Sequence, residues 1–135
     1  MIKKPEHKRT ILVVEDERPL VQIIQAKLEK VGFDVVTART VNQGLDYLKE
    51  VDRIDVIWLD HYLPGEKTGL DFVAELKKSN SKFAKIPIFV VSNTASSGNL
   101  RSYLRLGVTK YSVKAEHRLD EITLDIKSFL DEPEN

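Results

Sequence analysis

The stretch from Thr10 to Val31 decides the fold, and it reads TILVVEDERPLVQIIQAKLEKV. It starts with a short apolar run rich in β-branched residues, which is typical of a strand buried on both faces. Acidic residues follow, and Pro19 then suits the first turn of a helix. From Leu20 to Val31 apolar residues recur at helical spacing. A strand followed directly by an amphipathic helix is the repeating unit of an α/β fold.

The same unit recurs to the end of the chain. We expect strands at Thr10–Val14, Phe33–Thr37, Ile54–Leu59, Ile86–Val91 and Val108–Val113. Helical spacing of apolar residues predicts helices within 20–31, 41–48, 70–76, 100–104 and 119–130. Thr40 and Thr68 have the spacing of helix caps, and Gly32 and Gly107 fit positions just past helix ends. This alternation requires right-handed crossovers, so we predict a doubly wound α/β sandwich with five parallel strands and five helices.

Length and composition limit the functions that this chain can have. With 135 residues and 41% hydrophobic content, it suits one domain, which we place at residues 10–131 between tails at 1–9 and 132–135. The 21 basic residues balance the 21 acidic ones, so we expect no direct binding to nucleic acid. Absence of cysteine favours a cytoplasmic location. No apolar run suits a signal peptide or a membrane span, so we expect no membrane insertion.

Reactive side chains follow four of the expected strands. In open α/β sheets such groups gather beyond the carboxyl ends of the strands, and the order 2-1-3-4-5 would make the first and third strands neighbours. Glu15 and Asp16 would then converge on Asp60. The fourth and fifth strands contribute Ser92 and Lys114, whereas the second strand ends without a comparable group.

Convergent carboxylates repel one another unless a cation lies between them. Oxygen donors without cysteine or clustered histidine favour Mg²⁺. Lys114 and the Ser92 hydroxyl group could neutralise and bind further oxygens. A metal, a lysine, a hydroxyl group and a carboxylate nucleophile suffice for phosphoryl transfer. Asp60 is the predicted nucleophile, because it stands alone at a strand end, before the turn that contains Pro64 and Gly65.

Four short segments in this order resemble the motifs of response-regulator receiver domains. They are Ile11–Glu17 (ILVVEDE), Trp58–Gly65 (WLDHYLPG), Val90–Asn93 (VVSN) and Tyr111–Ala115 (YSVKA). The resemblance covers essentially the whole chain and implies a flavodoxin-like (CheY-like) sandwich. It makes Glu15 and Asp16 the acidic metal pair, Asp60 the phospho-acceptor and the Tyr62 backbone carbonyl a further metal ligand. It also makes Ser92 the switch hydroxyl group and Tyr111 the switch aromatic residue. Lys114 would be the lysine that is invariant in the family.

This resemblance implies a signalling function. Asp60 would accept a phosphoryl group, with Mg²⁺, from a sensor histidine kinase or a phosphotransfer protein of a phosphorelay. The new charge would then change binding to a downstream protein at the face formed by the fourth helix, the fifth strand and the fifth helix. Turnover would be limited to slow autodephosphorylation, so we expect no enzyme. The complete fifth helix and the absence of a linker favour a stand-alone adaptor or a phosphorelay intermediate.

The chain departs from the family pattern at three places. The interval from Asp60 to Gly69 is one residue longer than usual. Ala115 replaces the proline that usually forms a cis peptide after the lysine; without proline a cis bond costs about 3 kcal/mol, so the sequence leaves both a trans and a cis bond open. Glu15 is the longer and less common acid at its position, which changes the metal site without abolishing it.

Other functions fit these residues less well. An aspartate-nucleophile phosphohydrolase would need a second aspartate where Tyr62 stands. A flavodoxin would need a phosphate-binding loop where Glu15, Asp16 and Glu17 stand. A degenerate receiver that binds partners without phosphorylation remains the alternative. The three histidines (His7, His61 and His117) lack metal-ligand spacing, and we expect them to be solvated.

Overall fold

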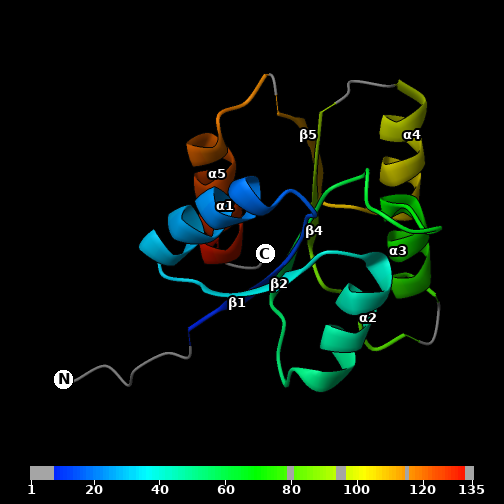
Figure 1. Cartoon of the computed structure of the whole chain (residues 1–135), viewed down its shortest axis with the longest axis horizontal. Coiled ribbons are helices and arrows are strands. Elements are labelled where there is room, and N and C mark those ends of the chain that lie inside the picture. Colours follow the sequence, from blue (N-terminus) through cyan, green and yellow to red (C-terminus); the bar gives the residue numbers. More distant parts are fainter. Residues whose placement is uncertain (1–7, 79–80, 94–96, 115, 133–135) are drawn as a thin grey trace.

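The computed structural model describes residues 8–78, 81–93, 97–114 and 116–132, and strands and helices alternate along them (Figure 1). The strands are β1 (Thr10–Val14), β2 (Asp34–Ala38), β3 (Val56–Leu59), β4 (Ile88–Ser92) and β5 (Lys110–Val113). The helices are α1 (Arg18–Lys30), α2 (Val41–Glu50), α3 (Gly69–Leu76), α4 (Ser97–Leu106) and α5 (Leu119–Asp131). The predicted elements are all confirmed. No helix in the described ranges is long and apolar enough to cross a membrane.

The strands form one parallel sheet in the predicted order β2-β1-β3-β4-β5. Helices α1 and α5 cover one face of this sheet, and α2, α3 and α4 cover the other (Figure 1). Because β1 and β3 are neighbours although β2 lies between them in the sequence, the direction of winding changes at β1. The crevice at such a switch point is where open α/β sheets place their ligands.

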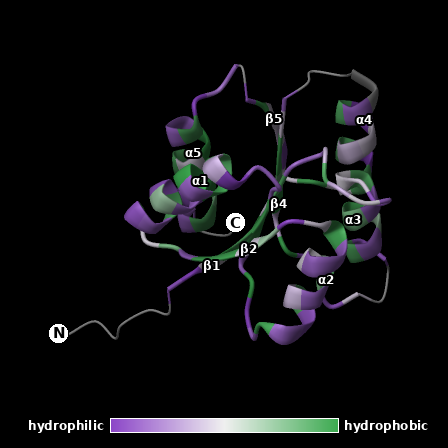
Figure 2. Ribbon diagram, viewed as in Figure 1, coloured by the Kyte–Doolittle hydropathy of each residue, from purple (hydrophilic) through white to green (hydrophobic). Residues whose placement is uncertain are grey.

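Apolar side chains fill both spaces between the sheet and the helices, and the hydrophobic colouring of the strands follows this (Figure 2). In β1, Leu12 and Val14 belong to the cluster under α2, α3 and α4, whereas Ile11 and Val13 belong to the cluster under α1 and α5. Successive strand residues point to opposite faces, so a strand that is covered on both faces, such as β3, needs apolar residues at every position. This requirement explains the continuous apolar runs of the sequence.

Three strands begin two residues later than the apolar pattern predicts. The third starts at Val56 instead of Ile54, the fourth at Ile88 instead of Ile86, and the fifth at Lys110 instead of Val108. The second strand starts one residue later, at Asp34. Ile54 is nevertheless buried, and Ile86 packs against the core while its N–H group donates to the Phe83 carbonyl in a turn. These residues contribute to the core from connecting segments, and an apolar run alone cannot distinguish that from a strand.

The predicted helix ends are present. The Thr40 hydroxyl group accepts from the Gln43 N–H group at 3.1 Å at the start of α2. The Thr68 N–H group donates to Asp71 Oδ2 at 2.8 Å at the start of α3. After α1, Gly32 has a φ of 103°, which residues with a Cβ adopt only with strain.

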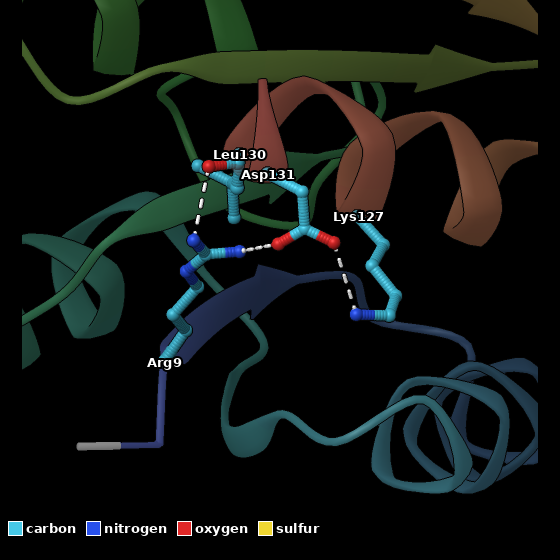
Figure 3. Close-up of polar contacts among 4 residues, drawn as sticks. All are labelled: Arg9, Lys127, Leu130 and Asp131. Carbon is cyan, nitrogen blue, oxygen red and sulfur yellow. Dashed lines mark hydrogen bonds and ion pairs between the residues drawn. The ribbon is translucent and has the colours of Figure 1, made fainter. Parts of the chain in front are cut away.

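Arg9 joins the beginning of the sheet to the end of the last helix (Figure 3). Its guanidinium group donates to the Leu130 carbonyl at 3.0 Å and to Asp131 Oδ1 at 2.5 Å. Lys127 contacts the other oxygen of the same carboxylate at 3.1 Å. These donors hold the pKa of Asp131 below its usual value. Arg9 directly precedes β1, so its hydrogen bond to a terminal carbonyl of α5 connects the end of that helix to the start of the sheet.

We expect Arg9→Ala to lower the Tm more than Lys127→Ala does. Both changes remove a cation from Asp131, but the arginine change also leaves the Leu130 carbonyl without its donor. Thermal denaturation of the two variants at the same pH and ionic strength measures the difference. Equal Tm values would show that the bond to Leu130 contributes nothing.

Candidate functional site

The predicted site residues lie at the carboxyl edge of the sheet. Asp60 directly follows β3, and its N–H group donates to the Val14 carbonyl of β1 at 3.0 Å. Lys114 directly follows β5, and its N–H group donates to the Ser92 carbonyl at the end of β4 at 2.8 Å. Strand pairing thus continues into the site and fixes the backbone from which each of these side chains extends.

Lys114 contacts both buried carboxylates. Its Nζ atom lies 2.8 Å from Glu15 Oε1 and 3.8 Å from Asp60 Oδ1. Glu15 is 3% exposed and Asp60 5% exposed. Because the desolvation of two carboxylates is costly, the lysine charge is needed to hold both in one place. The structure therefore brings Glu15, Asp60 and Lys114 together, as the sequence predicts.

The surroundings of Asp60 keep its carboxyl group poorly compensated. Burial and the neighbouring Glu15 charge raise the pKa of Asp60 to about 6, although Lys114 and the backbone N–H groups of His61 and Tyr62 oppose this rise. Asp60 Oδ1 is buried and accepts no hydrogen bond within the described residues. A buried carboxylate oxygen without a hydrogen-bond donor is poorly stabilised, so binding to a cation or an electrophilic centre is most favourable there.

Asp16 is paired with a residue that the sequence analysis did not select. Arg39 Nε and Nη2 lie 3.2 Å and 3.1 Å from Asp16 Oδ1. The expectation that the second strand ends without a comparable group is therefore wrong, because Arg39 directly follows β2 at the same edge of the sheet. Both side chains are partly exposed. The position of Arg39 after an expected strand was the available signal, and a single surface arginine did not stand out.

A hard divalent cation fits the donors at this edge. Mg²⁺ takes oxygen ligands and keeps several waters, so it needs few protein carboxylates. Asp60 Oδ1, which accepts no hydrogen bond within the described residues, and the adjacent Glu15 supply such oxygens. Among the described residues, no three acidic or histidine side chains are grouped closely enough to hold a metal alone. Asp16, whose Oδ1 is paired with Arg39, would supply the third carboxylate of the predicted set.

The remaining predicted residues surround this edge. Ser92 is fully buried at the end of β4, and Tyr111 of β5 is partly buried with its ring 5.7 Å from that of Tyr103. Tyr62 is 56% exposed in the segment after Asp60. Ala115 lies outside the described residues, so both geometries of its peptide bond stay open.

His61 corrects the expectation that the histidines are solvated. Its side chain is buried, and Nδ1 lies 2.6 Å from the Tyr103 hydroxyl group of α4. His117 is only partly exposed and lies 4.0 Å from Glu121, and His7 lies outside the described residues. Spacing along the sequence gave no sign of the Tyr103 contact, because 42 residues separate the partners.

Comparison with protein families identifies the family of this chain. The profile of the response regulator receiver domain matches residues 11–127. This chain is a member of the response-regulator receiver family. The match includes every residue that the sequence analysis placed in the site.

Solved receiver structures have the same fold. A CheY-like receiver domain from Methanospirillum hungatei JF-1 is 24% identical, with 93% of this chain and 95% of that chain covered and a TM-score of 0.81. The Mn²⁺-bound response regulator Rcp1 is also 24% identical, with coverages of 94% and 97% and a TM-score of 0.80. The phosphorylated cyanobacterial phytochrome response regulator RcpA is 28% identical, with 91% of each chain covered and a TM-score of 0.77.

Proposed function

We propose that this receiver accepts a phosphoryl group on Asp60 in the presence of Mg²⁺ and signals by changing its binding to another protein. The observation that carries the proposal is the buried Oδ1 of Asp60, which accepts no hydrogen bond within the described residues and lies beside Lys114 and Glu15. The family of the chain supports the same reaction. The donor would be a phosphohistidine of a sensor kinase or of a phosphotransfer protein.

The reaction forms one bond and breaks another. A carboxylate oxygen of Asp60 bonds to phosphorus while the bond from phosphorus to the donor imidazole nitrogen breaks, and that nitrogen takes the electron pair and then a proton. Lys114 is placed to stay beside the transferred oxygens, because its Nζ atom is already within 3.8 Å of Asp60 Oδ1. Bound Mg²⁺, held by Glu15, Asp16, Asp60 and the Tyr62 carbonyl, would neutralise the phosphoryl oxygens.

The output would be binding instead of turnover. Phosphorylation adds charge and acceptor oxygens at the end of β3, next to Ser92 of β4. We expect Ser92 and Tyr111 to pass this change to the face formed by α4, β5 and α5. Leu104 of α4 and Phe129 of α5 are apolar and exposed, and such side chains suit a protein partner better than a nucleic acid.

Intact-mass spectrometry after incubation with a small phosphodonor such as acetyl phosphate tests this proposal. We expect one phosphoryl adduct that requires Mg²⁺ and is absent from Asp60→Asn. Asp46→Asn is the matched control, because Asp46 is an exposed aspartate of α2 and its replacement should leave the adduct unchanged.

Either of two results would contradict the proposal. An adduct that persists in Asp60→Asn would place the acceptor elsewhere. Absence of any adduct from the native chain at saturating Mg²⁺ would favour the alternative, a receiver that binds its partner without phosphorylation.

A further inference from the structure

A buried side-chain contact connects the residue after Asp60 to helix α4. His61 Nδ1 and the Tyr103 hydroxyl group are 2.6 Å apart. The two residues are 6% and 0% exposed, so water does not compete for this hydrogen bond. Burial raises the pKa of Tyr103 and lowers that of His61. The hydroxyl group donates to Nδ1 in one tautomer of the imidazole, and the Nδ1–H group donates to the hydroxyl oxygen in the other.

Gly69 leaves the space that this contact needs. A Cβ atom at position 69 would collide with the Tyr103 hydroxyl group and lie 3.0 Å from the Asp60 backbone carbonyl. The Gly69 N–H group also donates to the His61 carbonyl at 3.2 Å. The carboxyl end of β3, the first residue of α3 and the Tyr103 side chain of α4 thus meet at one point.

The Tyr103 side chain is fixed at both ends. Its hydroxyl group is bound to His61, and its ring packs in the apolar cluster between the sheet and helices α2, α3 and α4, against Tyr111. A side chain held in this way transmits a displacement instead of absorbing it, because close-packed cores deform little. A shift of the backbone after Asp60 would therefore reach α4 through His61 and Tyr103.

We propose that Tyr103 is a positioning residue for the Asp60 segment, which it holds to α4 through His61. This connection runs through the Tyr103 hydroxyl group and so differs from the one that Ser92 and Tyr111 would form, although the rings of Tyr103 and Tyr111 are neighbours. It goes beyond the proposed function, because the contact is present without a phosphoryl group. A change in the charge of Asp60 by any means should then be detected at α4.

The experiment introduces Asp60→Asn as the change at the site and reads the response at α4. Backbone amide chemical shifts of residues 99–106 are compared between the native chain and Asp60→Asn in magnesium-free buffer. The same pair is then compared in the Tyr103→Phe background, which keeps the ring and removes the hydroxyl group. We expect the α4 response to fall roughly twofold or more, as for coupled sites.

Matched variants separate this hydrogen bond from a general effect on stability. His61→Leu should reduce the α4 response as Tyr103→Phe does, whereas His61→Asn should restore it, because the asparagine amide can occupy the position of Nδ1. Tyr47→Phe removes a hydroxyl group from α2 and should leave the response unchanged.

The outcomes are decisive without phosphorylation. A full α4 response in both Tyr103→Phe and His61→Leu would overturn the proposal, and so would the absence of an α4 response in the native chain. Loss of the response in both variants with recovery in His61→Asn would support it. A native chain that forms no phosphoryl adduct would contradict the proposed function and leave this result standing.

Discussion

Replacing Lys114 with methionine is expected to lower the free energy of unfolding by about 3–5 kcal/mol at pH 7 in magnesium-free buffer. Lys114 is the cation between Glu15 and Asp60, at 2.8 Å and 3.8 Å. Its removal leaves two buried carboxylates beside each other without compensation. Methionine keeps the length of the side chain and avoids a cavity, so the loss reports the charge.

Urea denaturation of paired variants measures this effect. Lys110→Met, at the start of the strand that Lys114 follows, is the control: its partner Asp125 is exposed, so we expect a change below about 1 kcal/mol. Adding Glu15→Gln to Lys114→Met should restore part of the stability, because one of the opposed charges is then removed. A loss equal to that of Lys110→Met would show that Lys114 does not compensate the buried pair.

The loss caused by Lys114→Met should shrink as the pH falls. Lys114 lowers the pKa of Asp60, so its removal raises this pKa further above 6. The folded state of the variant then binds a proton that the unfolded state does not bind until the pH nears the ordinary value of 3.8. Stability therefore rises as the pH falls through this window. A loss that is constant from pH 7 to pH 4 would exclude this electrostatic cause.

The fold and most of the site could be predicted because both depend on positions along the backbone. An apolar run followed by a helical pattern specifies a strand and its crossover, and the repeated unit then specifies a parallel sheet. The ends of parallel strands share one edge. Asp60 and Lys114 could therefore be placed together although 54 residues separate them.

The contacts of Arg39, His61 and Tyr103 could not be predicted because they depend on where side chains point. The spacing of Tyr103 places it on the buried side of α4, but no pattern shows that its hydroxyl group meets His61 at 2.6 Å. In the sequence, nothing distinguishes Arg39 from any other surface arginine. Its pairing with Asp16 follows from the position of the β2 end beside β1. Tertiary packing supplies this information.

Asp60→Asn is expected to raise the free energy of unfolding by about 2–3 kcal/mol at pH 7 in magnesium-free buffer. Burial and Glu15 raise the pKa of Asp60 from 3.8 to about 6, so at pH 7 the folded chain holds a charge that it stabilises poorly. Each pH unit between the two values corresponds to about 1.4 kcal/mol. Asparagine has nearly the same shape and carries no charge, so it removes this cost.

The dependence on pH and Mg²⁺ of the stability gained by Asp60→Asn identifies the cause of this gain. Below the unfolded-state pKa of 3.8, Asp60 is protonated in both states of the native chain, so the advantage of Asp60→Asn should shrink as the pH falls from 7 and disappear below this pKa. Asp46→Asn should give little change at either pH, since Asp46 is exposed on α2. Saturating Mg²⁺ should stabilise the native chain and reduce the difference in free energy of unfolding between it and Asp60→Asn at pH 7. If Asp60→Asn is instead less stable than the native chain at pH 7, Asp60 is not a strained charge, and its unpartnered Oδ1 does not mark the place of a cation.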